Sequence, residues 1–403
     1  MSKVFCWSSV LFAYLGLFAY GMADSVRMPV FSEFLRELHL SQTKGSLFFA
    51  LSSGVAILGS WSCHSFMNRW GRDLVYAVSL VAMALGCLGF FLSDELLILL
   101  LSSVIFGWSM GQLGVMVNLY ISTGVPPVHQ RKFFSGLHSM YGLAAFVAPL
   151  IVVATQALQW SWRYSFLIVS SFIFTLGVGR WLTRRTSWDL DAQQENIQNK
   201  FEKSSETGLE DFSRSSLKSP GSTFSWFDSF VLSGILGWYV VAEILVSSRL
   251  ALYMTQMHGL SLSMASQWLS AFFAALLLGR FVGTFFHFPF SLRSLLAGSN
   301  ILTFICLFLG VFVNPLFLVL SGLTMSVFYP VAMSYISTFA RGDLGKIMSV
   351  TLAVQSLLIM KMHLLVGYLS DWISLQWALL YGGAAVFFSL ICLVIYELKV
   401  ISR

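Results

Sequence analysis

Long apolar runs separated by short polar connections dominate the chain. The runs fall at about 4–25, 45–67, 74–92, 96–122, 134–157 and 163–182, and again at about 225–248, 262–286, 292–313, 315–339, 347–369 and 375–397. Each run is near the length of about 20 residues that an α-helix needs to cross the hydrocarbon core of a bilayer. The pattern therefore predicts an all-α integral membrane protein with twelve transmembrane helices.

A polar segment divides these runs into two groups of six. Residues 183–224 are rich in charged residues, serine and glutamine, which is typical of a solvated linker. We expect an N-terminal six-helix bundle over 1–182, a cytoplasmic linker over 183–224 and a C-terminal six-helix bundle over 225–403.

The two groups of runs also resemble each other in sequence. Asn118-Leu119-Tyr120-Ile121-Ser122 ends the fourth run as Met333-Ser334-Tyr335-Ile336-Ser337 ends the tenth, and the corresponding segments lie about 214 to 220 residues apart. Parallel repeats of six spans, with a substrate site between them near mid-bilayer, are the architecture of major facilitator transporters. The repeat therefore predicts two pseudo-symmetric six-helix bundles.

Composition and charge fit a membrane protein rather than a soluble one. Hydrophobic residues make up 57% of the chain and charged residues 10%, a balance that soluble domains do not show. The net charge of +6 is spread between the apolar runs, so we expect no nucleic-acid partner. The five cysteines lack metal-ligand spacing, and we expect no cofactor.

Lysine and arginine positions predict the orientation in the membrane. Positive loops stay on the cytoplasmic side, which places both termini in the cytoplasm and leaves five basic residues outside: Arg27, Arg36, Lys44, Arg163 and Arg249. We interpret the run after Lys3 as a retained first span, because no convincing cleavage site follows it. A plasma membrane or bacterial inner membrane is the expected location, and a monomer the expected state.

Short motifs resemble those of major facilitator transporters. Gly21–Pro29 is similar to a first-span signature, and Asn68-Arg69-Trp70-Gly71-Arg72 resembles the D-R-x-G-R loop with Asn68 in place of the acid. Three segments resemble the fucose:proton symporter-like group of sugar transporters: Leu137–Gly142, Tyr239–Glu243 with Gly279–Gly283, and Met325–Pro330. The resemblance implies the superfamily fold and a sugar-like solute.

The same resemblance bears on proton coupling. It places the coupling acids near the ends of the first and fourth spans, where this sequence has Met28 and Gly114. Neither side chain can carry a proton. The resemblance therefore implies that Asp24 takes this role in the first span, that another ion couples, or that the protein is a uniporter or exchanger.

Ionisable residues inside the spans are the first candidates for function, because a charge in the membrane needs a partner or water. Glu243 in the seventh span is a candidate proton carrier, since desolvation favours a protonated acid. The alternative is a structural partner for Arg249 or Lys361. Lys361 in the eleventh span either binds an anionic group of the solute or serves as the counter-ion of Glu243.

Three further charged residues are candidates for gating. Asp24 and Arg27 are three residues apart, so one helix face can hold them as an ion pair at the outer end of the first span; a solvated helix end is the alternative. Arg280 lies near the cytoplasmic end of the eighth span beside Gly279 and Gly283, and we expect it at a gate or helix interface.

Polar and aromatic side chains within the spans are candidates for solute binding. Gln112, Asn118 and His138 can form hydrogen bonds with hydroxyl groups, although polar residues also join transmembrane helices to each other. Trp238 and Tyr329 can stack on sugar rings, although most such aromatics only pack. We carry all five as candidate solute contacts.

These observations favour one function and leave two alternatives. The leading hypothesis is alternating-access transport of a small polar, sugar-like solute coupled to protons through Glu243 or Asp24. The second is an organic anion or drug transporter or exchanger that uses Lys361 and Arg27. The third is a non-transporting sensor on the same fold. No phosphate-binding loop or nucleophile motif supports an enzyme.

Overall fold

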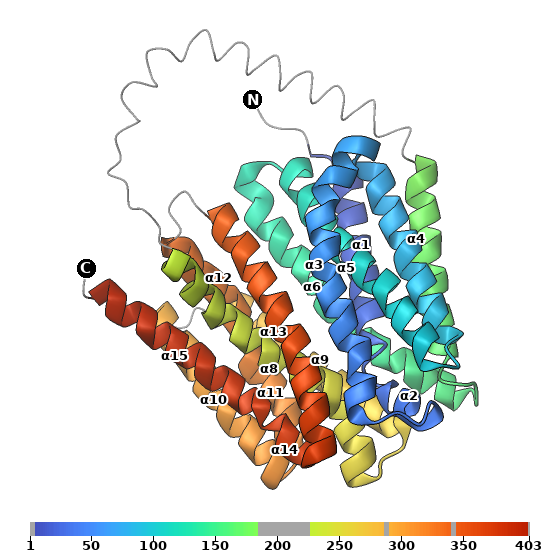
Figure 1. Cartoon of the computed structure of the whole chain (residues 1–403). Coiled ribbons are helices and arrows are strands. Elements are labelled where there is room, and N and C mark those ends of the chain that lie inside the picture. The colour runs from blue at the N-terminus through green and yellow to red at the C-terminus, as the bar shows by residue number, and fades with distance from the viewer. Residues whose placement is uncertain (1–4, 184–225, 286–289, 340–343, 402–403) are drawn as a thin grey trace, which may run out of the picture.

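The computed structural model describes residues 5–183, 226–285, 290–339 and 344–401, and every regular element in these ranges is helical (Figure 1). The first half contains the helices α1 (Trp7–Ser25), α2 (Phe31–Glu37), α3 (Gln42–Trp70), α4 (Arg72–Phe91), α5 (Leu96–Gly124), α6 (Pro127–Ala157) and Tyr164–Thr183. We call this group the N bundle.

The second half begins with a helix of 33 residues. Its helices are α8 (Trp226–His258), α9 (Leu262–Phe285), α10 (Leu292–Phe312), α11 (Leu316–Ser326), α12 (Phe328–Phe339), α13 (Leu344–Trp372), α14 (Leu375–Leu379) and α15 (Tyr381–Ile401). We call this group the C bundle. The expected linker over 183–224 lies outside the described residues apart from Thr183.

Twelve helical segments of the described chain account for the expected spans. Eleven are long and apolar enough to cross a membrane. Two of them are broken helices: α11 and α12 form one span over Leu316–Ile336, and α14 and α15 form another over Leu375–Val400. The twelfth is α1, whose 19 residues include tyrosines, serines and Asp24, which lower its hydropathy. The predicted all-α membrane fold is confirmed.

Glycines allow the second and fourth spans to pack closely. A Cβ atom on Gly111 of α5 would lie 2.0 Å from the carbonyl oxygen of Ala56 in α3, and one on Gly107 would lie 2.4 Å from that of Ser52. Small residues let transmembrane backbones approach in this way, because lipid supplies no hydrophobic force between helices. The N bundle is therefore assembled around the α3–α5 contact.

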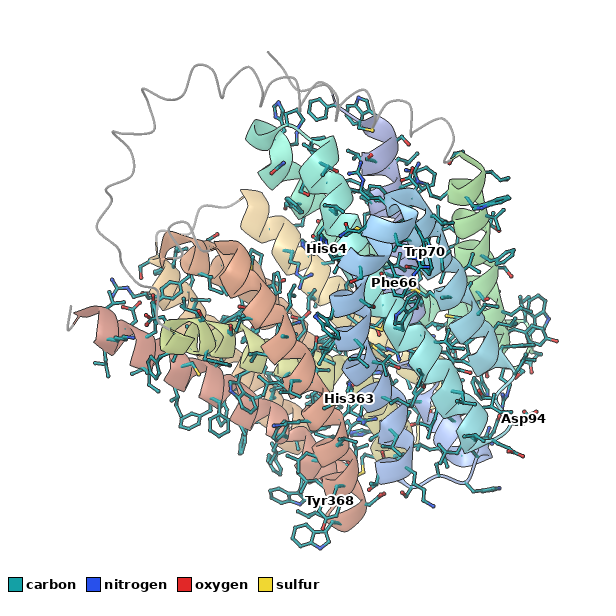
Figure 2. All side chains as sticks on the ribbon, turned by 45° about the horizontal axis from the view of Figure 1, so that its top comes forward. His64, Phe66, Trp70, Asp94, His363 and Tyr368 are labelled. Atoms are coloured by element: carbon teal, nitrogen blue, oxygen red, sulfur yellow. The ribbon has the colours of Figure 1, made fainter. Side chains whose placement is uncertain are left out.

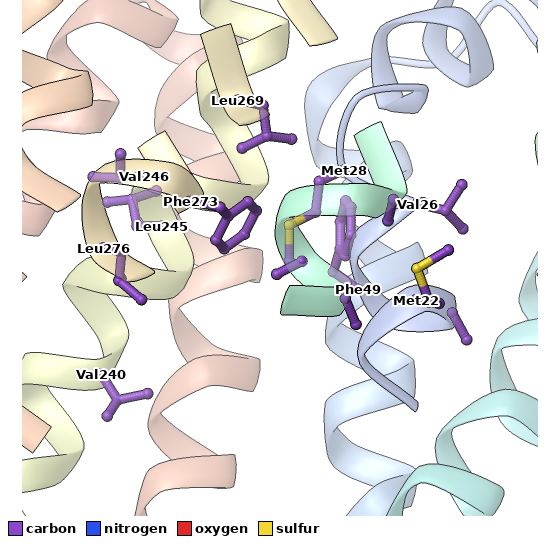
Figure 3. Close-up of a cluster of buried hydrophobic side chains, with 14 of the residues drawn as sticks. Met22, Val26, Met28, Phe49, Val240, Leu245, Val246, Leu269, Phe273 and Leu276 are labelled. Carbon is purple, nitrogen blue, oxygen red and sulfur yellow. The ribbon is translucent and has the colours of Figure 1, made fainter. Parts of the chain in front are cut away.

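The two bundles meet along two helix pairs. Helix α3 packs on α13, and α6 packs on α9. Met28, which lies between α1 and α2, and Phe49 of α3 face Phe273 of α9 across this boundary (Figure 3). Several of the functional candidates, among them His138 and Tyr329, lie beside the same boundary.

The two bundles are joined by hydrogen bonds at one end of the molecule and diverge toward the other. Helix α2 lies at one end, which we call the α2 end, and the helices adjoining the 184–225 segment lie at the other, the linker end (Figure 1). At the α2 end the Asp371 carboxylate of α13 accepts the backbone N–H groups of Gln42 and Thr43, at 2.8 and 2.7 Å. The Gln42 amide also donates to Gln256 of α8 at 2.8 Å. These bonds join the bundles at this end, whereas α3 and α13 diverge toward the linker end (Figure 1).

Candidate functional site

An acid–arginine pair lies in the C bundle next to the bundle boundary. Glu243 of α8 and Arg280 of α9 approach to 3.4 Å, and their side chains are 15% and 21% exposed. Nη1 of Arg280 also lies 4.0 Å from the position that a Cβ atom on Gly142 of α6 would occupy. Arg280 therefore extends from the C bundle to the surface of the N bundle.

A second acid–arginine pair lies in the N bundle. Asp24 at the end of α1 forms an ion pair with Arg27, as the spacing predicted, and both side chains are buried. The Tyr141 hydroxyl of α6 donates to Asp24 Oδ2 at 2.7 Å. Arg27 also donates to Ser52 of α3 at 3.1 Å, and its guanidinium lies over the Phe106 ring at 4.3 Å. Arg27 is therefore held by hydrogen bonds, a carboxylate and aromatic faces.

Tyr141 connects the two pairs. It is bonded to Asp24, and it lies within electrostatic range of Glu243 in the opposite bundle. Its ring is 5.9 Å from that of Tyr20 on α1. Each bundle thus contributes one acid with its own arginine, and Tyr141 on a boundary helix is hydrogen bonded to one of these acids. Tyr141 was not among the predicted site residues, although it lies inside the Leu137–Gly142 motif.

His138 and Tyr329 face each other across the boundary. Their ring centroids are 6.2 Å apart, with His138 on α6 and Tyr329 on α12. Tyr329 lies just after Val327, where the tenth span breaks between α11 and α12. Arg280 is within electrostatic range of both side chains. The structure therefore brings together four predicted site residues, namely Glu243, Arg280, His138 and Tyr329, in one region of the boundary.

Three other predicted solute contacts have hydrogen-bond or ring partners of their own in the protein. Gln112 of α5 is fully buried, and its amide donates to Ser62 of α3 at 3.1 Å. Asn118 donates to the carbonyl of Gly114 in its own helix at 2.7 Å. The Trp238 ring lies 5.1 Å from Phe388 of α15, inside the C bundle. Gln112 and Trp238 thus contact neighbouring helices, Asn118 is bonded within its own helix, and all three stay predictions as solute contacts.

Lys361 is separated from the acid that we expected as its partner. It is exposed and shares a helix face with Leu357, Leu364 and Tyr368, which are also exposed. No carboxylate of the described chain lies within 4.0 Å of it, and the ion-pair partner of Glu243 is Arg280 rather than Lys361 or Arg249. His363, two residues further along α13 (Figure 2), is instead buried, and its ring stacks on that of Phe49 with centroids 5.0 Å apart.

Arg249 was expected after the end of the seventh span, whereas the structure places it within α8. Helix α8 continues to His258, ten residues beyond the predicted end at 248, so Arg249 is a residue of the helix interior. Its side chain is completely buried. An arginine lowers the local hydropathy equally whether it is buried within a helix or lies in a loop, so the apolar pattern alone predicts an end at this position.

A further polar cluster near the linker end was not predicted. Asp73 of α4 pairs with Arg180 of the Tyr164–Thr183 helix, and the Tyr120 hydroxyl of α5 donates to Asp73 at 2.7 Å. Arg72 next to it donates to Thr123 at 3.0 Å. An acid therefore follows the Asn68–Arg72 loop, five residues after the position where the resemblance expects it. The position of Asp73 directly after Arg72 is the feature of the sequence that could have indicated this cluster.

Comparison with known proteins supports this architecture. A family model described as Major Facilitator Superfamily matches residues 13–313. No curated protein matches the sequence. Two solved structures of a bacterial homologue of the human lysosomal transporter Spinster, inward-facing and either occupied or unoccupied, share 14% identity with a TM-score of 0.70 and cover 99% of this chain and 97% of theirs.

The chain is equally similar in fold to a sugar transporter. The inward open xylose transporter XylE from E. coli shares 15% identity with a TM-score of 0.70, over 96% of this chain and 95% of that one. At this level of identity the likeness establishes the fold and not the solute.

Proposed function

Because the chain belongs to the Major Facilitator Superfamily, we propose that it is a secondary transporter that moves a small polar, sugar-like solute by alternating access, coupled to protons through Glu243 and Asp24. The two acid–arginine pairs on either side of Tyr141 are the observation that carries this proposal. The similarity in fold to a xylose transporter and the resemblance to fucose-type symporters support the sugar-like solute.

The Glu243–Arg280 pair offers a way to link a proton to the solute. When Glu243 is ionised, it holds Arg280 by charge. A proton on Glu243 removes that attraction, so the Arg280 guanidinium becomes available to donate hydrogen bonds to solute hydroxyl groups. His138 and Tyr329 on the facing helices supply further hydrogen-bonding groups and an aromatic face. Proton and solute would then bind together.

The orientation follows from the charge pattern. We assign the α2 end to the outside and the linker end to the cytoplasm, because cytoplasmic loops are richer in lysine and arginine. The Asp371 and Gln42 bonds would then close the external side. The similar structures are described as inward-facing or inward open, which supports this assignment.

The test uses purified protein in proteoliposomes on a solid-supported membrane. A panel of neutral hexoses and pentoses is applied with and without an inward proton gradient, and the transient current is recorded. We expect at least one sugar to give a current that rises with the gradient. Glu243→Gln should abolish the gradient dependence, because glutamine cannot exchange a proton.

A matched variant controls for loss of folding. Glu95→Gln makes the same change at an exposed position just before α5 and should leave the current intact. A sugar current that ignores the gradient in the unmodified protein, or that keeps its gradient dependence in Glu243→Gln, rejects coupling through this acid.

A further inference from the structure

A second buried arginine lies at the boundary without a carboxylate. Arg249 of α8 is 0% exposed, and its Nη2 donates to the Ser46 hydroxyl of α3 at 2.7 Å. Its Nε and Nη1 atoms are buried and have no hydrogen-bond partner. Phe31 and Phe49 cover its guanidinium, with ring centroids at 4.5 and 5.5 Å. No carboxylate in the part of the chain that the structure describes lies within 4.0 Å.

His363 adds a second incompletely bonded basic group. It is buried and stacked on the same Phe49 ring with an interplanar angle of 18°, and its Nδ1 atom has no hydrogen-bond partner. The Arg27 guanidinium lies 5.2 Å from this ring as well. Three basic side chains, those of Arg27, Arg249 and His363, therefore surround Phe49. Arg27 is the one that forms an ion pair with Asp24.

Arg27 of the N bundle shows what is missing around Arg249. Each arginine bonds to a serine of α3: Arg27 to Ser52 and Arg249 to Ser46. Three residues before Arg27 the chain has Asp24, which pairs with it, whereas three residues before Arg249 it has Val246. Arg249 therefore has a serine partner like that of Arg27 and lacks the carboxylate.

A buried cation without a counter-charge is costly, and pairing it with an anion removes much of that cost. We propose that Arg249, with Ser46 and His363, forms an anion-binding site that takes a carboxylate or a small inorganic anion when the bundles part at the α2 end. The bound anion would do for Arg249 what Asp24 does for Arg27.

Access to the site rests on the proposed alternating access. Arg249 is enclosed by α2 and α3 of the N bundle, so parting of the bundles at the α2 end exposes it to water. An anion that binds only the open form favours that form. The anionic group can belong to a transported solute or to a free ion, and these sources are separated by the choice of probe.

The experiment measures anion binding to the purified protein by thermal shift. Sodium acetate, phosphate and chloride are titrated at constant ionic strength against a bulky sulfonate salt. We expect saturable stabilisation by at least one of these anions. Arg249→Gln should raise its apparent Kd about tenfold or more, as loss of a charge-assisted hydrogen bond does. The apparent Kd of Arg249→Lys should lie between those of the unmodified protein and Arg249→Gln, because lysine keeps the charge but lacks the planar guanidinium group.

A surface variant controls for general charge effects. Arg36→Gln removes one positive charge at the same end from a side chain that is 71% exposed, and should leave the Kd unchanged. Without anions, Arg249→Met should melt at or above the temperature of the unmodified protein, because it removes an uncompensated buried charge. This variant keeps the test meaningful if Arg249→Gln is poorly folded.

The outcomes separate this inference from the proposed function. Saturation by acetate alone assigns the site to a carboxylate, and saturation by chloride or phosphate assigns it to a free ion. The absence of saturable stabilisation by all three anions, or an unchanged Kd in Arg249→Gln, overturns the site. Because binding is measured without transport, a failure of the sugar currents leaves this result standing, and the reverse also holds.

Discussion

At the scale of single residues, Arg27 and Arg249 show how the surroundings determine the state of a buried charge. Arg27 has a carboxylate, a serine and three aromatic rings around it. Arg249 has a serine and two rings but no carboxylate among the described residues. The same side chain is therefore a satisfied structural group in one bundle and an open binding group in the other.

This difference predicts an asymmetric response to mutation. Asp24→Val gives Arg27 the surroundings of Arg249, and it should lower the free energy of unfolding by about 3–5 kcal/mol, because a buried charge loses its partner. Adding Arg27→Met to Asp24→Val should recover a large part of that loss. Thermal unfolding in detergent measures both, and a double variant that is no more stable than Asp24→Val would contradict the role of Asp24 as the counter-ion.

At the scale of the helices, the sequence predicted the positions of the spans well and the side-chain contacts between the spans poorly. The apolar runs located all twelve segments, and the spacing of Asp24 and Arg27 predicted their pairing, because both depend on local periodicity. The partner of Glu243 could not be found in this way, since Arg280 lies on another helix and several basic residues were available. The same limit applies to Gln112, whose contact with Ser62 depends on how α3 and α5 pack.

The α3–α5 contact gives a prediction with a control in the same helix. Gly111→Ala places a Cβ atom against the Ala56 carbonyl, so the helices must separate and stability should fall by about 1–3 kcal/mol. Gly114→Ala meets no atom within 4 Å and should be neutral or slightly stabilising, because alanine favours a helix more than glycine does. Equal melting temperatures for the two variants would show that the close contact is not needed.

At the scale of the whole molecule, the structure consists of two bundles that meet along α3–α13 and α6–α9, with the acid–arginine pairs beside that boundary. The repeat predicted this plan, because a twofold sequence similarity implies two similar bundles. The sequence repeat did not predict at which end of the molecule the two bundles are joined. The carboxylate of Asp371 caps the first residues of α3 from the opposite bundle, and such a contact between distant residues leaves no mark on local sequence.

The central claim is that the two bundles rock about this boundary, and paired spin-label distances test it most directly. One label pair replaces Lys44 and His258 at the α2 end, and the other replaces Arg69 and Ser294 at the linker end; all four residues are exposed. Asp371→Ala removes the cap on α3 and should favour opening at the α2 end. The account predicts that the first distance then lengthens while the second shortens. Two distances that stay fixed, or that change in the same direction, would contradict it.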